Sequence, residues 1–275
     1  MLVWVLAIVA GLALAMLSSR RAVTHLTSLA SGSRIPPFFF GITLVAIGTD
    51  LPEIANSIAA AVSGHGDLNV GDSIGSATTQ LTLILAIFPF IVGSFAIKRA
   101  EVALVGGVTV LSLAMGAILL SDGELSSADA AILILAWVMS SVALWRQGTL
   151  RSPVLEKSGG GKGYHALVAL VYLALVGIGA TLAVTAFVKL SAMLSIPEYL
   201  ISFFAASLGT SLPELFFDVT AIRKGESQLA IGGIFGASLV DSTLSLAIGP
   251  LIDPTAINAS IAVRGSIVAI LAVLI

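Results

Sequence analysis

Two short segments of the sequence place a glutamate directly after a proline inside a long apolar stretch. Residues 48–53 read Gly-Thr-Asp-Leu-Pro-Glu, and residues 209–214 read Gly-Thr-Ser-Leu-Pro-Glu. An ionisable side chain is costly inside a membrane and usually faces an ion or substrate path. We therefore expect Glu53 and Glu214, within these two motifs, to form part of an ion-binding site built from broken membrane helices.

The residues around the two glutamates offer further oxygen ligands. Because proline lacks a backbone N–H, each helix is predicted to break just before it and to free backbone carbonyls. Such carbonyls are tolerated inside a membrane only where they line a polar cavity or bind a ligand. The carbonyls predicted to be freed are those of Ala46, Ile47, Thr49, Ser207 and Thr210. Carboxylate, hydroxyl and carbonyl oxygens are hard ligands, of the kind that binds Ca²⁺ or Na⁺.

The helix after each motif contains a second polar set. Residues 75–80 read Gly-Ser-Ala-Thr-Thr-Gln, and residues 236–241 read Gly-Ala-Ser-Leu-Val-Asp. Ser76 and Gln80 are four residues apart and share one helix face, as do residues 237 and 241. Glycines at 71, 75, 232 and 236 have the spacing that lets membrane helices pack closely.

The two regions are copies of one unit, offset by 161 residues, the difference between 214 and 53. Without gaps, 16 of the 42 residues at 48–89 are identical to those at 209–250, including several glycines and prolines. An odd number of helices, five, separates the copies, so they should cross the membrane in opposite directions as an inverted-topology repeat.

Composition indicates the elements that hold these motifs. The 275 residues are 57% hydrophobic and only 10% charged, with a mean hydropathy of +1.09, whereas soluble domains are about 25% charged. The chain is therefore predicted to be an all-α polytopic membrane protein. About nine spanning helices are expected, at 2–18, 35–63, 68–94, 101–120, 127–145, 164–188, 197–222, 228–250 and 257–275. Helix five would map to 288–306, so we expect either that the second repeat lacks its last helix or that this sequence is a shortened form.

Charge distribution predicts the orientation. Most Lys and Arg residues fall in the odd-numbered loops: Arg20, Arg21, Arg34, Lys98, Arg99, Arg146, Arg151, Lys157, Lys162, Arg223 and Lys224. The positive-inside rule then places the N-terminus outside and the basic loops in the cytoplasm. We expect the protein to lie in the plasma membrane. The histidines at 25, 65 and 165 fall in predicted loops and are not expected to form a metal site.

We interpret residues 1–275 as one membrane transport domain. Its first half spans 1–146 with a repeat at 46–89, and its second spans 164–275 with a repeat at 207–250. Residues 147–163, rich in Gly, Ser and Lys, are predicted to be a cytoplasmic linker.

The doubled pattern, Gly-Thr-Ser-x-Pro-Glu followed by Gly-x-x-x-Gly-Ser-x-x-x-Asn/Asp, resembles the two α-repeats of the cation/calcium exchanger (CaCA) superfamily, especially its sodium/calcium exchanger branch. The resemblance covers both repeats. It implies a secondary active antiporter that exchanges Ca²⁺ for Na⁺ at midplane sites by alternating access, with the first and sixth helices as a sliding gate. It also implies no enzyme chemistry and no cofactor; Ca²⁺ and Na⁺ are transported, with H⁺ as a further candidate.

By the same resemblance, Glu53 and Glu214 are the central ligands shared by Ca²⁺ and Na⁺. Thr49 and Thr210 add backbone carbonyls to the Ca²⁺ site, and Asp241 flanks the centre.

The remaining family roles concern Na⁺. Ser211 with the Ser207 carbonyl implies an outward-side Na⁺ site, and Ser76 with the Ala46 carbonyl implies an inward-side one.

Three residues depart from the family pattern. Asp50 and Ala237 stand where the family usually has Ser, and Gln80 replaces Asn. These changes bear on the number of Na⁺ ions. Asp50 could instead cap the helix that follows it, and Gln80 could be a link between helices as readily as a ligand.

Asp50 would join Glu53, Glu214 and Asp241 as a fourth carboxylate near one site. Four like charges at close range cannot all stay ionised without cations. We hypothesise that Asp50 or Asp241 is protonated when Ca²⁺ is bound. Asp72 and Asp218 have no carboxylate equivalent in the other repeat, and we leave both out of the site.

The expected partners are inorganic cations and the lipid bilayer, without nucleic acid or a partner protein, so the protein should act as a monomer. Two alternatives stay open within transport: a H⁺-coupled and a K⁺-dependent cation/Ca²⁺ exchanger. From another class, paired aspartates Asp50 and Asp241 could suggest an intramembrane aspartyl protease, although this would leave the duplicated glutamates unexplained.

Overall fold

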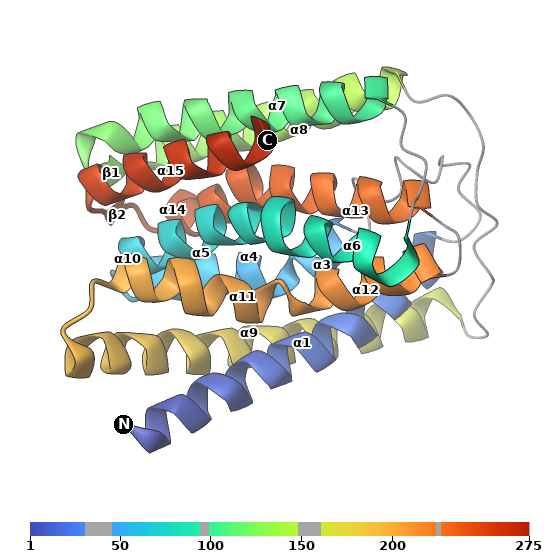
Figure 1. Ribbon diagram of the computed structural model, residues 1–275. Helices are drawn as coiled ribbons and strands as arrows, with labels where there is room; N and C mark the ends of the chain where they lie inside the picture. The colour runs from blue at the N-terminus through green and yellow to red at the C-terminus, as the bar shows by residue number, and fades with distance from the viewer. Residues whose placement is uncertain (31–45, 94–98, 148–160, 224–226, 275) are drawn as a thin grey trace.

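The computed structural model describes residues 1–30, 46–93, 99–147, 161–223 and 227–274 (Figure 1). Six helices in this part of the chain are long and apolar enough to cross a membrane: Leu2–Ala22, Gly66–Ile91, Val102–Asp122, Ser127–Leu144, Gly163–Leu194 and Ala230–Ile252. Two shorter apolar helices, Leu51–Val62 and Ala259–Leu274, lie among them. The prediction of a polytopic helical membrane protein is confirmed. The count of nine stays a prediction, because residues 35–45 of the second expected helix lie outside the described residues.

The elements of the first half, in chain order, are α1 (Leu2–Ala30), α3 (Ala46–Thr49), α4 (Leu51–Val62), α5 (Gly66–Thr79), the π-helix η2 (Gln80–Ile84), α6 (Leu85–Val92), α7 (Arg99–Leu119), the 3₁₀ turn η3 (Leu120–Asp122), β1 (Glu124–Leu125) and α8 (Ser127–Gln147).

The elements of the second half are α9 (Lys162–Leu194), α10 (Glu198–Ile201), the π-helix η4 (Ser202–Ala206), α11 (Ser207–Thr210), α12 (Leu212–Arg223), α13 (Ser227–Val240), the π-helix η5 (Asp241–Ser245), α14 (Leu246–Ile252), β2 (Thr255–Ala256) and α15 (Ala259–Leu274). Most of the predicted linker, at 148–160, lies outside the described residues. The helix α9 begins at Lys162, so it includes the last two residues of the segment predicted as linker.

The internal repeat is visible in the secondary structure. Four pairs of elements, α3 and α11, α4 and α12, α5 and α13, and η2 and η5, begin and end 161 residues apart. In Figure 1 the chain runs from α3 to α4 in the direction opposite to its run from α11 to α12. The two copies of the unit are therefore inverted relative to each other.

Each motif interrupts its helix as the prolines predicted. The interruptions fall at Asp50 (φ −77°, ψ 8°) and at Ser211 (φ −79°, ψ 6°), two residues before the proline. The prediction that two of the preceding carbonyls are freed is wrong. The Asp50 N–H donates to the Ala46 carbonyl at 2.9 Å, and the Ser211 N–H donates to the Ser207 carbonyl at 3.0 Å. Each break is so short that the last helical bond before it survives.

Glycines bring α5 against the second half of the protein. A Cβ atom on Gly71 would lie 2.5 Å from the Tyr199 carbonyl oxygen, and one on Gly75 would collide with the Phe203 carbonyl. Only glycine permits this approach of helix to backbone, so the close packing predicted from the glycine spacing is confirmed for α5.

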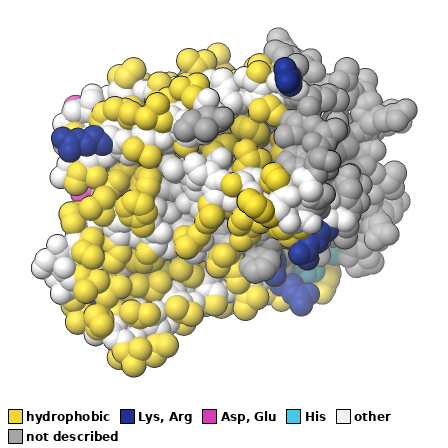
Figure 2. Space-filling model, in the orientation of Figure 1, with side chains coloured by type: hydrophobic (Ala, Val, Ile, Leu, Met, Phe, Trp, Pro, Cys, Tyr) yellow, Lys and Arg dark blue, Asp and Glu magenta, His cyan; other side chains and the backbone are white. Residues whose placement is uncertain are grey.

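The helices α1 and α9 form a tightly packed pair along one side of the bundle (Figure 1). A Cβ atom on Gly11 or on Gly179 would lie 2.6 Å from the carbonyl oxygen of the other glycine. Between α9 and α4 an apolar cleft of about 360 Å³ is lined by side chains that include Ile58 and Val176. Hydrophobic side chains spread over much of the visible face (Figure 2), as a lipid-facing surface requires.

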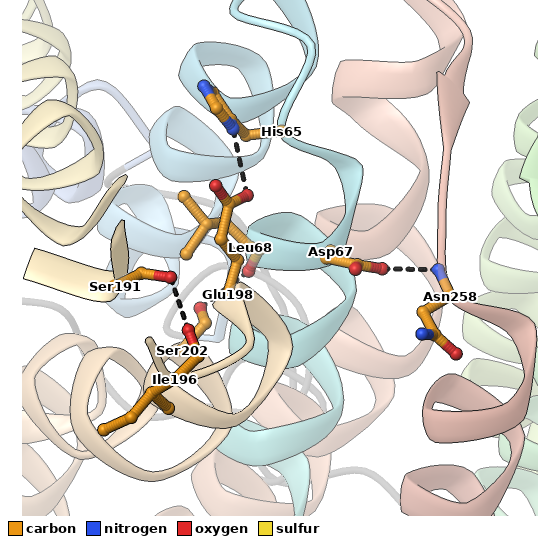
Figure 3. Close-up of polar contacts among 8 residues, drawn as sticks. All are labelled: His65, Asp67, Leu68, Ser191, Ile196, Glu198, Ser202 and Asn258. Carbon is orange, nitrogen blue, oxygen red and sulfur yellow. Dashed lines mark hydrogen bonds and ion pairs between the residues drawn. The ribbon is translucent and has the colours of Figure 1, made fainter. Parts of the chain in front are cut away.

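Polar contacts hold together the end of the bundle where α4 turns into α5 (Figure 3). His65 pairs with Glu198 at the start of α10, with 2.9 Å between Nδ1 and Oε2. The Asn258 N–H donates to Asp67 Oδ1 at 2.6 Å. These contacts fasten the start of α5 to α10 and to the segment before α15.

The structure corrects the placement of two histidines. His25 lies in α1 and His165 in α9, and their Nδ1 atoms are 2.9 Å apart. The sequence ended the first helix at residue 18, but α1 continues to Ala30 and packs against α9. The expectation that both histidines lie apart in loops is therefore wrong.

Candidate cation-binding site

Three carboxylates meet where the two broken helices face each other. Asp50, Glu53 and Glu214 offer oxygen atoms that all lie within 4.8 Å of one another. At most 1% of each residue is exposed, and none of the three carboxylates has a hydrogen-bond partner. The first repeat supplies two of these groups and the second repeat supplies one, so the cluster exists only because the two repeats pack together.

Local sequence explains where these groups point. Leu51 and Pro52 begin α4, and Glu53 follows in its first turn; Glu214 has the same place in α12. A carboxylate is stabilised in the first turn of a helix, where the backbone dipole is positive. Asp50 directly precedes α4, yet its side chain makes no capping hydrogen bond. Asp50 therefore stands at the cap position without the hydrogen bond of a cap, and its role stays a prediction.

Gln80 and Asp241 form a second part of the site. Gln80 Nε2 donates to Asp241 Oδ2 at 2.9 Å, and Ser238 Oγ donates to Gln80 Oε1 at 2.9 Å. The other oxygen of Asp241, Oδ1, is buried without a partner. Asp241 interacts electrostatically with Asp50, Glu53 and Glu214. The four carboxylates predicted to share one site are therefore neighbours.

Sequence reasoning missed Asp72 and Asn56. Thr210 Oγ1 lies 3.4 Å from Ser76 Oγ and donates to Asp72 Oδ1 at 3.1 Å. Asn56 Nδ2 donates to the other oxygen, Asp72 Oδ2, at 2.5 Å. Asp72 therefore holds the side chain of Thr210, a predicted ligand. Its position one helical turn before Ser76 was an available signal, but the lack of a counterpart in the second repeat argued against it.

The remaining predicted site residues are also buried. Ser211 Oγ has no hydrogen-bond partner, and the Thr49 hydroxyl donates to the Ala46 carbonyl at 3.2 Å. Ser207 Oγ donates to the Phe203 carbonyl at 2.5 Å. All eleven predicted site residues lie in the interior: Ala46, Thr49, Asp50, Glu53, Ser76, Gln80, Ser207, Thr210, Ser211, Glu214 and Asp241.

The arrangement is suited to holding cations. Three carboxylates without donors repel one another strongly at low dielectric. The ion pair found among the described residues joins His65 to Glu198 at the end of the bundle. Within this part of the chain, no basic side chain pairs with the three clustered carboxylates. Oxygen ligands of this type and number match the preference of a hard cation such as Ca²⁺.

The comparisons with known proteins agree with this geometry. The sequence matches the family described as "Sodium/calcium exchanger protein" over residues 3–146 and 164–275. The chain belongs to the sodium/calcium exchanger family. Its resemblance to the cation/calcium exchanger superfamily is thereby confirmed.

Named relatives of this exchanger cover most of its length. It is 33% identical to the putative antiporter CaxA of Alkalimonas amylolytica, over 100% of this chain and 88% of that protein. It is 32% identical to the inner membrane protein YrbG of Escherichia coli strain K12, over 91% of this chain and 80% of the relative.

The fold of the exchanger matches a solved structure of the sodium–calcium exchanger NCX_Mj. The TM-score is 0.65 at 24% identity, over 99% of this chain and 90% of the other. The exchangers and antiporters of this family are transporters, so the protein is not an enzyme and the alternative of an aspartyl protease is set aside. The roles of the individual site residues stay predictions.

Proposed function

We propose that the protein is a secondary active antiporter that exchanges Ca²⁺, or a similar divalent cation, for Na⁺. The observation that supports this most directly is the buried cluster of Asp50, Glu53 and Glu214, whose oxygens lie within 4.8 Å of one another and lack any protein donor. A divalent cation is the ligand that best offsets such a charge, and it must leave when a competing cation replaces it.

The names of relatives support the choice of ions. A 23% identical relative from Methanosarcina acetivorans is named sodium/calcium exchanger MaX1. Two of the NCX_Mj structures are described as soaked with Na⁺ together with Sr²⁺ or with Ca²⁺. Na⁺ and Ca²⁺ would use the same oxygen-rich centre, because both are hard cations.

Alternating access would come from the pair α1 and α9, acting as a sliding gate. Both helices are long, and between residues 166 and 188 α9 contains no ionisable side chain other than Tyr172. Leu12 of α1 packs against Gly209 of the second motif, so α1 lies directly over the broken helix. Bound ions need only bias two conformations of similar energy to drive exchange.

We place the protein in the plasma membrane as a monomer. The positive-inside rule places its basic loops in the cytoplasm. The counter-ion is the part of the proposal with competing candidates. A H⁺-coupled exchanger and a K⁺-dependent exchanger would use the same carboxylates, so flux measurements must decide between them.

The test is Ca²⁺ flux in proteoliposomes with gradients of Na⁺, K⁺ and pH imposed one at a time. We expect an outward Na⁺ gradient alone to drive Ca²⁺ accumulation against its own gradient. Accumulation driven only by K⁺ or by pH would replace Na⁺ with that ion as the coupling partner. Ca²⁺ movement that ignores every counter-ion gradient would contradict exchange and indicate a passive channel.

A further inference from the structure

Asp218 is a buried carboxylate that the site described above does not use. It lies on α12 four residues after Glu214, on the same helix face and about 6 Å further along the helix axis. Only 1% of the residue is exposed. Its equivalent in the first repeat is Ser57, so the internal symmetry does not require a charge at this place.

Neither oxygen of Asp218 has a hydrogen-bond donor. Asp72, the other carboxylate without a counterpart, differs in this respect, because Asn56 and Thr210 each donate to one of its oxygens. Burying a carboxylate without donors is strongly unfavourable unless a cation or a proton joins it. The fold therefore satisfies Asp72 from within the protein and leaves Asp218 available to a ligand.

The space for this carboxylate is created by Gly233 on the neighbouring helix α13. A Cβ atom on Gly233 would lie 2.5 Å from Asp218 Oδ1. Under the 161-residue offset, Gly233 is the equivalent of Asp72. In the first repeat the unmatched carboxylate therefore lies on α5, where Asn56 of α4 donates to it. In the second repeat it lies on α12 and faces Gly233 of α13.

The inverted repeat places the two unmatched carboxylates on opposite sides of the central cluster. Asp218 lies between Glu214 and the end of α12 at Arg223. Asp72 lies between Ser76 and the start of α5 at Gly66, which is packed against Thr255 at the other end of the bundle. Asp218 is also near enough to Glu214 to interact with it electrostatically.

We propose that Glu214 and Asp218 together form a further cation position, between the central cluster and the end of the bundle that contains Arg223. A hard cation leaving the centre toward that end would pass from Asp50 and Glu53 to this pair before it reaches solvent. This inference rests on the proposed exchange function and adds to it a residue outside the predicted ligands.

The test uses Asp218→Asn in the full-length protein, since amide and carboxylate have the same shape. The sequence contains no cysteine. Arg223→Cys and a membrane-impermeant maleimide can therefore report which end of the bundle faces outward in proteoliposomes. Ca²⁺ is then varied on one side at a time, on wild type and variant in the same orientation.

We expect Asp218→Asn to weaken the apparent Ca²⁺ affinity about tenfold from the side of Arg223 and to leave the other side unchanged. Gly233→Ala should reproduce this one-sided loss, because its Cβ displaces the Asp218 carboxylate without changing the charge of the protein. Gly107→Ala, where a Cβ meets nothing within 4 Å, is the matched control and should behave as wild type.

An unchanged or equally weakened affinity on both sides in Asp218→Asn, while wild type exchanges normally, would overturn this inference alone. Wild-type protein that shows no counter-ion-driven Ca²⁺ flux would overturn both the inference and the proposed function. Should Asp218→Asn fail to fold, Asp218→Ser, which restores the residue of the first repeat, is judged by the same one-sided criterion.

Discussion

Gln80 and Asp241 occupy equivalent positions in the two repeats and are hydrogen-bonded to each other, with 2.9 Å between Nε2 and Oδ2. Each residue also begins a π-helical segment, η2 or η5. A direct bond between equivalent residues means that the pseudo-twofold axis of the inverted repeat passes between them. The protein thus places one amide and one carboxylate at its axis of symmetry, and holds one ionisable group there rather than two.

This relationship predicts the behaviour of Gln80→Ala. The substitution removes the donor to Asp241, and a hydrogen bond to a charged group contributes about 1.5–3 kcal/mol. We expect the apparent Ca²⁺ affinity of the variant to change by about tenfold or more. Because Ser238 acts through Gln80, the effects of Gln80→Ala and Ser238→Ala should not be additive in a double-mutant cycle of Ca²⁺ uptake.

A different pattern would identify Gln80 as a link between helices only. In that case Gln80→Ala would lower the thermal unfolding temperature in detergent while leaving the concentration dependence for Ca²⁺ and Na⁺ unchanged.

The central glutamates should be indispensable. Glu53→Gln and Glu214→Gln preserve side-chain shape but each remove one charge from the buried cluster. Losing one partner of a buried charge interaction costs about 3–5 kcal/mol, which is about 100-fold or more in affinity. We expect radiolabelled Ca²⁺ uptake at low Ca²⁺ to fall to background in both variants.

Glu124 provides the control for these substitutions. It lies in β1 with its side chain exposed, so Glu124→Gln should leave Ca²⁺ uptake unchanged. Uptake by Glu53→Gln or Glu214→Gln that equals uptake by Glu124→Gln would refute the assignment of the central ligands.

The substitution Asp50→Ser should show whether Asp50 is a cation ligand or a helix cap. The change gives the first motif the sequence of the second. Because the Asp50 side chain caps nothing, thermal stability should not fall. The apparent Ca²⁺ affinity should weaken by about tenfold, since one of three clustered carboxylates is lost.

Asp129 gives the opposite pattern. Its Oδ2 accepts hydrogen bonds from the backbone N–H and the hydroxyl of Ser126 at the start of α8. Asp129→Ala should lower stability by about 1 kcal/mol, the usual effect of a lost cap, without altering Ca²⁺ dependence. Reversed results for the two variants would show that Asp50 is structural.

Gly75→Ala should disable transport through packing. The added methyl group collides with the Phe203 carbonyl, and α5 must move away from the segment that leads to α11. Ser76 would then separate from Thr210, now 3.4 Å away between hydroxyl oxygens. We expect a marked fall in both thermal stability and Ca²⁺ uptake.

Gly107→Ala on α7 is the matched control. It meets no neighbour and gains helix propensity, so stability should be unchanged or higher by up to about 1 kcal/mol. Equal behaviour of Gly75→Ala and Gly107→Ala in thermal melts would contradict the close-packing argument.

The features predicted correctly from the sequence are those with a local physical cause. Proline at 52 and 213 favours a helix break, and a glutamate among apolar residues in the next turn is expected to be buried. The internal repeat then adds long-range information, because two equivalent segments of an inverted pair must meet near the same axis.

The features missed depend on contacts between distant segments. Thr210 bonds Asp72 across 138 residues, and nothing near Asp72 in the sequence indicates this partner. His25 lies in a helix because α1 is packed along α9, although its neighbouring arginines favoured a loop. The Ala46 carbonyl kept its hydrogen bond because its donor is the N–H of Asp50, whereas the N–H missing at Pro52 would have bonded the carbonyl of Gly48.

The mutual approach of Gly11 and Gly179 has a consequence for how the molecule could work. A Cβ atom on either glycine would collide with the carbonyl of the other, so the two backbones are in close contact and we expect α1 and α9 to move as one body. The hydroxyls of Thr181 and Thr185 donate to backbone carbonyls within α9, and Thr181 lines the largely apolar cleft beside α4. In the proposed antiporter, the oxygen atoms of the centre would then set the ion selectivity, and the apolar surface between α9 and α4 would set how fast the pair α1 and α9 moves.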